Sequence, residues 1–178
     1  MAGTLVFDVE TRRLADEVGG WGHIRELGLS VAVTYDPERE EYQTYLEEQA
    51  CELVAALRGA TLVVGFNVLR FDYEVLRAYT DDPLLDLPTV DILQDLYRSL
   101  GWRPRLDDVA RATLGTAKGA DGFQAVQWFR SGQLGKLIDY CRRDVEVTWR
   151  IYDFGRHNRF VRVLQRGYQT RPVAVTWR

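Results

Sequence analysis

The order of the first elements constrains the fold of this chain more than any other sequence feature. Residues 4–9, 27–34 and 41–45 are rich in β-branched and aromatic side chains and predict three strands in succession. A helix is expected over residues 47–58, followed by a short, fully apolar strand over residues 60–65. An antiparallel meander followed by helix, strand and helix predicts an α/β fold, in which helices flank a mixed central β-sheet.

The rest of the chain is expected to add helices and a final hairpin to this sheet. The segments are helix 71–79, strand 89–93, helices 106–114, 122–130 and 132–154, and a hairpin of strands 160–164 and 172–177 connected through Gly167. Gly155 is a natural stop for the longest helix, and Asp107 or Asp108 most simply caps the helix that starts at residue 106.

A single domain is expected over residues 1–178, because the chain is too short for two ordinary domains. We divide it into a core over residues 1–155 and a basic C-terminal hairpin over residues 156–178, which holds six arginines and no acidic residue. The net charge of -3 argues against a protein that holds nucleic acid by bulk charge alone. The segregated arginines, Arg159 and Arg162 among them, either grip phosphate groups or form an ordinary solvated face.

Nothing in the sequence predicts a membrane span or a secretory leader. The longest apolar runs, such as residues 60–66, fall short of the ~20 residues that a membrane span needs, and the N-terminus lacks a basic segment followed by an apolar one. Cys51 and Cys141 stand far apart and outside any CxxC or Cys/His cluster, so we expect two reduced, buried thiols rather than a zinc site. These features predict a cytoplasmic protein without membrane contact.

Asp8 and Glu10 stand two residues apart at the end of the first predicted strand. Because successive side chains of a strand alternate between its faces, both carboxylates lie on the same face and can share one metal ion. An apolar strand that ends in Asp-x-Glu also arises by chance, and on its own such a pair more often marks two surface carboxylates.

Two later segments add further carboxylates. Between Gly65 and Asp72 a buried strand stops and a helix begins, which places Asp72 in the first helical turn. The helix dipole favours an acidic residue there with or without a function. Tyr140 and Asp144 are one helical turn apart, at the margin of the buried stripe of the longest helix, where side chains can reach a cleft.

Four acidic residues from separate elements suit a two-metal phosphodiesterase. Hard divalent cations such as Mg²⁺ prefer carboxylate oxygens and retain waters that exchange with phosphate. One ion would lower the pKa of the attacking water, and both would neutralise charge on the phosphorus. We assign Tyr140 to orienting that water rather than to removing its proton, because a phenol with a pKa of about 10 is a poor base near neutral pH.

Three motifs, taken in order, resemble the exonuclease motifs of the DEDD superfamily. They are Phe7-Asp8-Val9-Glu10-Thr11, Gly65-Phe66-Asn67 with Phe71-Asp72, and Tyr140-Cys141-Arg142-Arg143-Asp144-Val145. The tyrosine variant of the superfamily fits, because position 139 is Asp139 rather than a histidine. The look-alikes are the proofreading exonuclease domain of family B DNA polymerases and the ribonuclease H-like domains attached to some DEAD/DEAH-type helicases.

This resemblance implies a ribonuclease H-like fold, two Mg²⁺ or Mn²⁺ ions, and 3′–5′ exonuclease hydrolysis of phosphodiester bonds in DNA or RNA. Asp8, Glu10 and Asp144 would hold the first ion, Asp8 would bridge to the second, and Asp72 would act nearby, partly through water. The implied substrate is a single-stranded 3′ end of nucleic acid. The candidate protein partners are a helicase or a polymerase acting in trans.

Candidate substrate-binding residues accompany these acids. Thr11, Asn67 and Phe71 belong to the motifs, and Trp21 and His23 lie in a glycine-containing loop, where they can stack on or contact a terminal nucleotide. Three of them have an ordinary alternative: Asn67 as a turn or cap residue, Trp21 as a ring packed under its loop, and His23 as a solvent-facing side chain.

Two alternatives keep the same fold. A catalytically silent module would bind nucleic acid or a partner, but a degenerate domain would be expected to lose at least one of several mutually repelling carboxylates. A structure-specific endonuclease would cut within a strand or at a branch, and the sequence is compatible with it. DNA and RNA both remain open, because no side-chain signature marks a contact with the 2′-hydroxyl.

Overall fold

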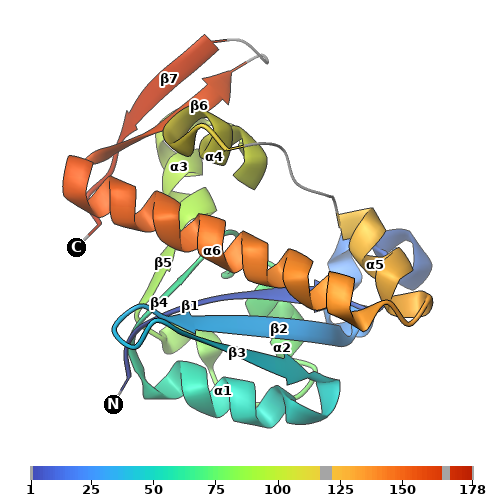
Figure 1. The fold of residues 1–178 in the computed structure, drawn as a ribbon. Coiled ribbons are helices and arrows are strands. Elements are labelled where there is room, and N and C mark those ends of the chain that lie inside the picture. The colour runs from blue at the N-terminus through green and yellow to red at the C-terminus, as the bar shows by residue number, and fades with distance from the viewer. Residues whose placement is uncertain (1, 117–121, 166–168, 178) are drawn as a thin grey trace.

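A five-stranded sheet forms the centre of the computed structural model, which describes residues 2–116, 122–165 and 169–177 (Figure 1). Its strands are β1 (Ala2–Thr11), β2 (Leu29–Asp36), β3 (Glu41–Leu46), β4 (Ala60–Gly65) and β5 (Thr89–Asp91). They lie in the order β3-β2-β1-β4-β5. The first three strands pair antiparallel, as predicted, whereas β4 pairs parallel with β1 and β5 pairs parallel with β4.

Helices cover both faces of this sheet. They are α1 (Ala50–Gly59), α2 (Asp72–Leu76), α3 (Ile92–Leu100), α4 (Leu106–Leu114), α5 (Gly122–Arg130) and α6 (Leu134–Asn158). Short 3-10 helices are η1 (Ala15–Val18), η2 (Trp21–Leu27), η3 (Glu47–Gln49) and η4 (Leu84–Asp86). Figure 1 shows α6 crossing one face of the sheet and α1 lying on the opposite face.

The chain ends in a separate antiparallel hairpin of β6 (Phe160–Gln165) and β7 (Gln169–Ala174). The predicted mixed sheet flanked by helices, with a C-terminal hairpin, is therefore confirmed. The predicted connection through Gly167 lies outside the described residues. Figure 1 shows the hairpin beside α3 and α4, on the side of α6 away from β1, β2 and β3.

Successive residues of β1 serve two cores on opposite faces of the sheet. Leu5 and Phe7 pack in the core that contains α1, whereas Val6 packs in the core that contains α6. These three side chains are at most 6% exposed, and burying one such side chain stabilises the fold by about 1.5–3 kcal/mol. Because residues two apart share a face, Asp8 and Glu10 continue the face of Val6 and are directed toward α6.

The segment predicted as a short strand or extended piece over residues 89–93 divides between two elements. The carboxylate of Asp91 accepts a hydrogen bond from the N–H of Gln94 over 3.1 Å and so caps the start of α3. Ile92 and Leu93 consequently lie in the first turn of a helix and contribute to its buried face. The prediction was wrong there, because a short apolar run does not by itself distinguish a strand from a buried helical turn.

The helix predicted over residues 71–79 is shorter in the structure, since α2 ends at Leu76. Ala78 and Tyr79 follow in tight turns, bonded to carbonyls three residues back. The hydroxyl of Tyr79 accepts a hydrogen bond from the N–H of Leu29 over 2.8 Å and donates to Glu47 over 2.7 Å. These contacts tie the end of the segment to other elements instead of continuing the helix.

The longest helix does not stop at Gly155. That residue is buried within α6, and a Cβ atom on it would lie 2.4 Å from the ring of Trp177. The helix ends instead at Asn158, and the C-cap residue Arg159 adopts a left-handed backbone with a φ of 65°. The glycine thus provides room for an aromatic ring from the C-terminal segment rather than a helix stop.

Two smaller expectations also failed. The N-cap of α4 is Arg105, which makes no capping side-chain hydrogen bond, and Asp107 and Asp108 lie within the first turn. Acidic side chains in that turn still interact favourably with the helix dipole. Cys51 is exposed on α1, because the buried stripe of that helix runs through other positions, whereas Cys141 is buried as predicted.

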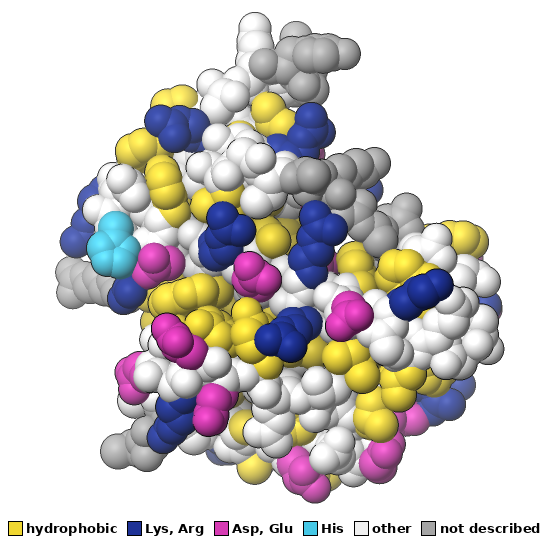
Figure 2. Space-filling model, in the orientation of Figure 1, with side chains coloured by type: hydrophobic (Ala, Val, Ile, Leu, Met, Phe, Trp, Pro, Cys, Tyr) yellow, Lys and Arg dark blue, Asp and Glu magenta, His cyan; other side chains and the backbone are white. Residues whose placement is uncertain are grey.

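Charge is mixed on the face of the molecule shown in Figure 2, where acidic and basic side chains intersperse along α6 rather than forming one basic patch.

Throughout the described part of the chain, no helix combines the length and the apolar character needed to cross a membrane.

Candidate metal centre

The first two carboxylates lie where β1 passes beneath α6. Asp8 and Glu10 share the face of β1 that is directed toward α6, and Glu10 is 9% exposed. Ligand atoms of Asp8, Glu10 and Cys141 all lie within 4.8 Å of one another. Strand alternation and the buried stripe of α6 therefore bring together residues more than a hundred positions apart.

The third carboxylate, Asp72, approaches from the start of α2. Its Oδ1 accepts a hydrogen bond from the N–H of Val9 over 3.0 Å, and its side chain is only 1% exposed. Since Val9 lies between Asp8 and Glu10, this bond fixes Asp72 beside both. Repulsion by the Asp72 carboxylate contributes to raising the pKa values of Asp8 and Glu10, after the larger effect of burial.

The fourth carboxylate and the tyrosine come from α6. The hydroxyl of Tyr140 hydrogen-bonds to the carboxylate of Asp144, one helical turn away. The ring of Tyr140 packs edge-on against Trp128 of α5, with 5.8 Å between centroids. Burial, followed by repulsion from Asp144, raises the pKa of Tyr140 far above its usual range, so the phenol keeps its proton and acts as a donor.

Burial is the main cause of the unusual acidities at this centre. It raises the pKa of Asp72 to about 8 and that of Asp144 to about 6. Asp8 and Glu10 have pKa values well above their ordinary ones, because burial and then repulsion between the carboxylates oppose ionisation. No Lys or Arg among the described residues lowers the pKa of Asp8 or Glu10, so their negative charge lacks a protein cation.

Cys141 belongs to the same cluster of ligand atoms, but its thiol acts as a hydrogen-bond donor. Its Sγ lies 3.4 Å from the carbonyl oxygen of Asp8 and 3.7 Å from Asp8 Oδ2. Burial and the nearby carboxylates raise the pKa of this thiol well above its usual value. Hard divalent cations such as Mg²⁺ prefer oxygen ligands to thiols, so the carboxylate oxygens are the donors that suit such an ion here.

An open cleft of about 600 Å³ reaches this centre. The predicted site residues that line it are Asp8, Glu10, Thr11, Trp21, Asn67, Phe71, Tyr140 and Asp144. Asp72 lies behind this lining, where it bonds to the backbone of β1. The structure thus gathers the predicted catalytic residues and the motif residues around one cavity.

A model of the RNase H superfamily matches residues 5–154 of this chain. The chain belongs to the RNase H superfamily. Members of this superfamily are generally nucleases that use divalent metal ions. Comparison with curated protein sequences gave no match.

Among solved structures, the RNase H superfamily domain resembles the family B DNA polymerase from the hyperthermophilic archaeon Pyrobaculum calidifontis. The TM-score is 0.63 and the sequence identity is 16% over 85% of this chain. The match spans 24% of the polymerase chain. It supports the ribonuclease H-like fold predicted from the sequence.

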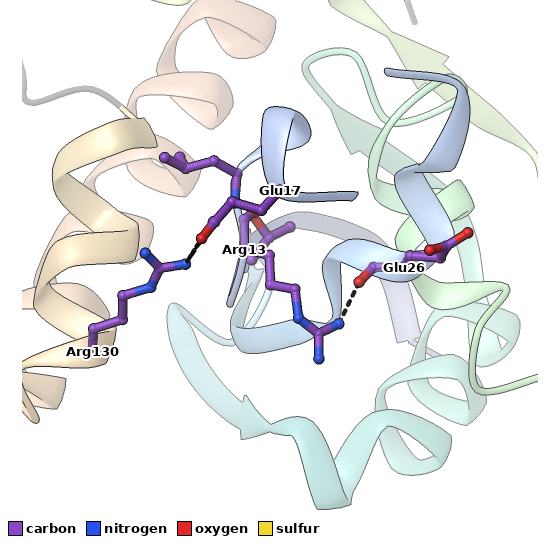
Figure 3. Close-up of polar contacts among 6 residues, drawn as sticks. Arg13, Glu17, Glu26 and Arg130 are labelled. Carbon is purple, nitrogen blue, oxygen red and sulfur yellow. Dashed lines mark hydrogen bonds and ion pairs between the residues drawn. The ribbon is translucent and has the colours of Figure 1, made fainter. Parts of the chain in front are cut away.

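The rim of the cleft in this RNase H superfamily domain is built by the loop after β1 and by α5 (Figure 1). Arg130 of α5 donates to both carboxylate oxygens of Glu17 in η1, over 2.6 and 2.5 Å (Figure 3). Arg13 donates to the carbonyl oxygen of Glu26 over 2.6 Å. The contact between Arg130 and Glu17 links the two walls of the cleft, whereas the bond from Arg13 to Glu26 lies within the segment after β1.

Trp21 projects from this rim and is 70% exposed, so it is not packed under its loop. Its ring meets Phe71 edge-on, with 6.3 Å between centroids. His23, in contrast, pairs with Glu26 over 2.9 Å and does not line the cleft. Of these two loop residues, only Trp21 is available to a ligand in the cleft.

Arg159 and Arg162 do not line the cleft. Arg159 donates from its guanidinium to the carbonyl oxygen of Trp177 over 3.0 Å and closes the end of α6. The guanidinium of Arg162 lies 4.9 Å from the ring centre of Phe160. Their role in substrate binding stays a prediction, and the structure brings them to the hairpin rather than to the carboxylates.

Asp91 is an organising residue that sequence reasoning did not assign to the site. Its carboxylate accepts the N–H groups of Asn67 over 2.9 Å and of Leu69 over 3.0 Å. Asn67 adopts a left-handed backbone with a φ of 73°, which this pair of bonds helps to hold. A signal was present in the sequence, since Asp91 follows a segment predicted to be extended, as Asp8 does.

Proposed function

We propose that this chain is a metal-dependent 3′–5′ exonuclease that hydrolyses phosphodiester bonds in DNA or RNA. The observation that carries the proposal is that Asp8, Glu10, Tyr140 and Asp144 line one open cleft, with a fourth carboxylate, that of Asp72, directly behind this lining. Membership of a superfamily composed generally of nucleases supports it.

The donor set fits Mg²⁺ or Mn²⁺, because it consists of buried carboxylates without a protein cation beside Asp8 and Glu10. Asp8, Glu10 and Asp144 would hold one ion, with Asp8 shared by a second. Asp72 would contribute through water, because one of its oxygens is already bonded to Val9. Bound ions would supply positive charge at the phosphate and acidify a water molecule.

Tyr140 is suited to positioning the attacking water. Its hydroxyl proton is engaged with Asp144, so the phenolic oxygen is left to accept a hydrogen bond from water. A water that donates to this oxygen turns a lone pair away from Tyr140 and toward the cleft. The raised pKa of Tyr140 excludes it as the base, in agreement with the role proposed from the sequence.

The cleft suits the unstacked end of a single strand. Its volume of about 600 Å³ is in the range of pockets that enclose small ligands rather than a double helix. Trp21 and Phe71 offer aromatic surfaces for the terminal base, and Thr11 and Asn67 offer polar groups. A helicase or polymerase acting in trans would supply such an end.

The test is degradation of 5′-labelled single-stranded DNA and RNA, beside closed circular forms, with Mg²⁺, Mn²⁺ or a chelator. A metal-dependent ladder that shortens from the 3′ end, with intact circles and an inactive Asp8→Ala variant, is the expected result. Cut circles would identify an endonuclease instead. Binding of these substrates without any cleavage would identify a silent binding module.

A further inference from the structure

A second groove lies directly beside the cleft. Its volume is about 360 Å³, and it shares Trp21, Asn67 and Phe71 with the cleft. Its other lining residues are Ile24, Arg70 and Arg103, so the groove contains two arginines and no acid. The charge of the lining residues therefore changes from mainly negative in the cleft to positive in the groove, on the two sides of a wall that both cavities share.

Both arginines of this groove are exposed and lack an ion-pair partner among the residues that the structure describes. Neighbouring arginines differ in this respect. Arg25 and Arg77 both pair with Glu74, over 3.1 and 2.6 Å. The charges of Arg70 and Arg103 are thus available to an anionic ligand, whereas the two neighbouring arginines already share an ion pair with Glu74.

Both arginines are connected to the loop around Asn67, one through the chain and one through a hydrogen bond. Arg70 directly precedes Phe71, in the segment that Asp91 fixes through the N–H groups of Asn67 and Leu69. Arg103 donates a hydrogen bond to Oδ1 of Asn67. Because a guanidinium has only donors, this contact directs the amide nitrogen of Asn67 away from Arg103.

We propose that this groove binds backbone phosphates of the nucleotides that precede the terminal one, through Arg70 and Arg103. The inference rests on the proposed function, because it assumes that the 3′-terminal nucleotide occupies the cleft. A strand leaving the cleft past Trp21 enters the groove at once, since the two cavities share a wall. Guanidinium groups bind phosphate oxygens with paired, charge-assisted hydrogen bonds, which position a strand without reading its sequence.

The sharpest test is the dependence of affinity on oligonucleotide length. Fluorescence anisotropy of labelled single strands of two to six nucleotides, in chelator to prevent cleavage, measures binding by the whole chain. Affinity should rise by about tenfold as the strand grows past the cleft, and the Arg70→Gln/Arg103→Gln variant should lose that rise. The salt slope of its binding should fall by about 1.4, because two single-strand phosphate contacts are lost.

The matched control is Arg111→Gln/Arg150→Gln, which removes the same charge from exposed residues that line neither cavity. This control should keep both the length dependence and the salt slope of the wild type. An equal loss in the control would overturn the inference, since general charge would then explain the effect. An unchanged length dependence in the Arg70→Gln/Arg103→Gln variant would overturn it as well.

A kinetic experiment separates this inference from the proposed function. In Mg²⁺, the ratio of KM for a hexanucleotide to KM for a dinucleotide should rise by about tenfold in the Arg70→Gln/Arg103→Gln variant. Cleavage with an unchanged ratio would leave the exonuclease standing and overturn the groove. Length-dependent binding through these arginines without any cleavage would support the groove and contradict the exonuclease.

Discussion

The N–H of Val9 donates a hydrogen bond of 3.0 Å to Oδ1 of Asp72, and this bond joins the second carboxylate-bearing segment to the first. β4 pairs with β1 only as far as Val6, so Val9 lies beyond the end of that pairing. Asp72 accepts the hydrogen bond in this position, at 1% exposure. One oxygen of Asp72 therefore has a structural task, which leaves the other for chemistry.

Replacing Asp72 separates these two tasks. Asp72→Asn keeps an oxygen that can accept the Val9 N–H, whereas Asp72→Ala leaves that buried donor without a partner. Both variants lack the charge, so Asp72→Ala should be less stable than Asp72→Asn by about 1–3 kcal/mol. Urea unfolding in chelator measures this difference. Equal stability of the two variants would show that the bond to Val9 contributes nothing to the free energy of unfolding. Both variants should be inactive in cleavage, because both lack the carboxylate.

The stability of the metal-free protein should fall as pH rises from about 5 to about 8. Burial raises the pKa of Asp72 to about 8 and that of Asp144 to about 6. An unfolded chain releases these protons near pH 4, so the folded state binds more protons across this window and ionisation disfavours it. The melting temperature in chelator, measured across that range, reports this trend, which Asp72→Asn should weaken.

Divalent metal should change this pH dependence. Mn²⁺ competes with protons for the same carboxylates, so its stabilising effect should grow with pH. The comparison is the melting temperature with Mn²⁺ minus that in chelator at each pH. A stabilisation by Mn²⁺ that is independent of pH would argue against these carboxylates as its ligands.

Much of the site could be predicted because local periodicity places side chains reliably. Asp8 and Glu10 share a face because strands alternate, and Tyr140 and Asp144 project together because they are one helical turn apart. Their convergence on one cleft could be expected only from the resemblance of the motifs. The fold followed from the order of strands and helices, as the mixed sheet shows.

The remaining features depend on partners distant in sequence. Nothing local to Arg70 or Arg103 indicates that they line one groove, since Arg103 lies in the connection after α3. The arginine-rich end was the more conspicuous candidate, yet Arg159 is occupied by the carbonyl of Trp177. The groove that contains Arg70 and Arg103 thus becomes visible only in the folded structure, and phosphate binding by the C-terminal arginines stays a prediction.

Cys141 tests the composition of the metal centre. Its Sγ lies within 4.8 Å of ligand atoms of Asp8 and Glu10, but hard divalent cations prefer oxygen ligands to sulfur. Cys141→Ala should therefore retain metal-dependent cleavage and the same relative response to Mg²⁺ and Mn²⁺, while losing about 1 kcal/mol of stability through a small cavity. Cleavage assays and urea unfolding measure both, with Cys51→Ala on the surface as control. Loss of metal binding in Cys141→Ala alone would identify the thiol as a ligand.

Gly155 and Gly135 lie in the same helix and should respond in opposite ways to alanine. Alanine ordinarily stabilises a helix interior by about 1 kcal/mol over glycine, and at Gly135 no atom lies within 4 Å of the added Cβ. At Gly155 the Cβ would lie 2.4 Å from the Trp177 ring, which also stacks on Tyr152 at 5.8 Å between centroids. Gly155→Ala should therefore cost about 1–3 kcal/mol, because the ring must leave its place. Chemical unfolding of both variants measures the contrast, and stabilisation of both would mean that the Trp177 contact does not hold the C-terminal segment against α6.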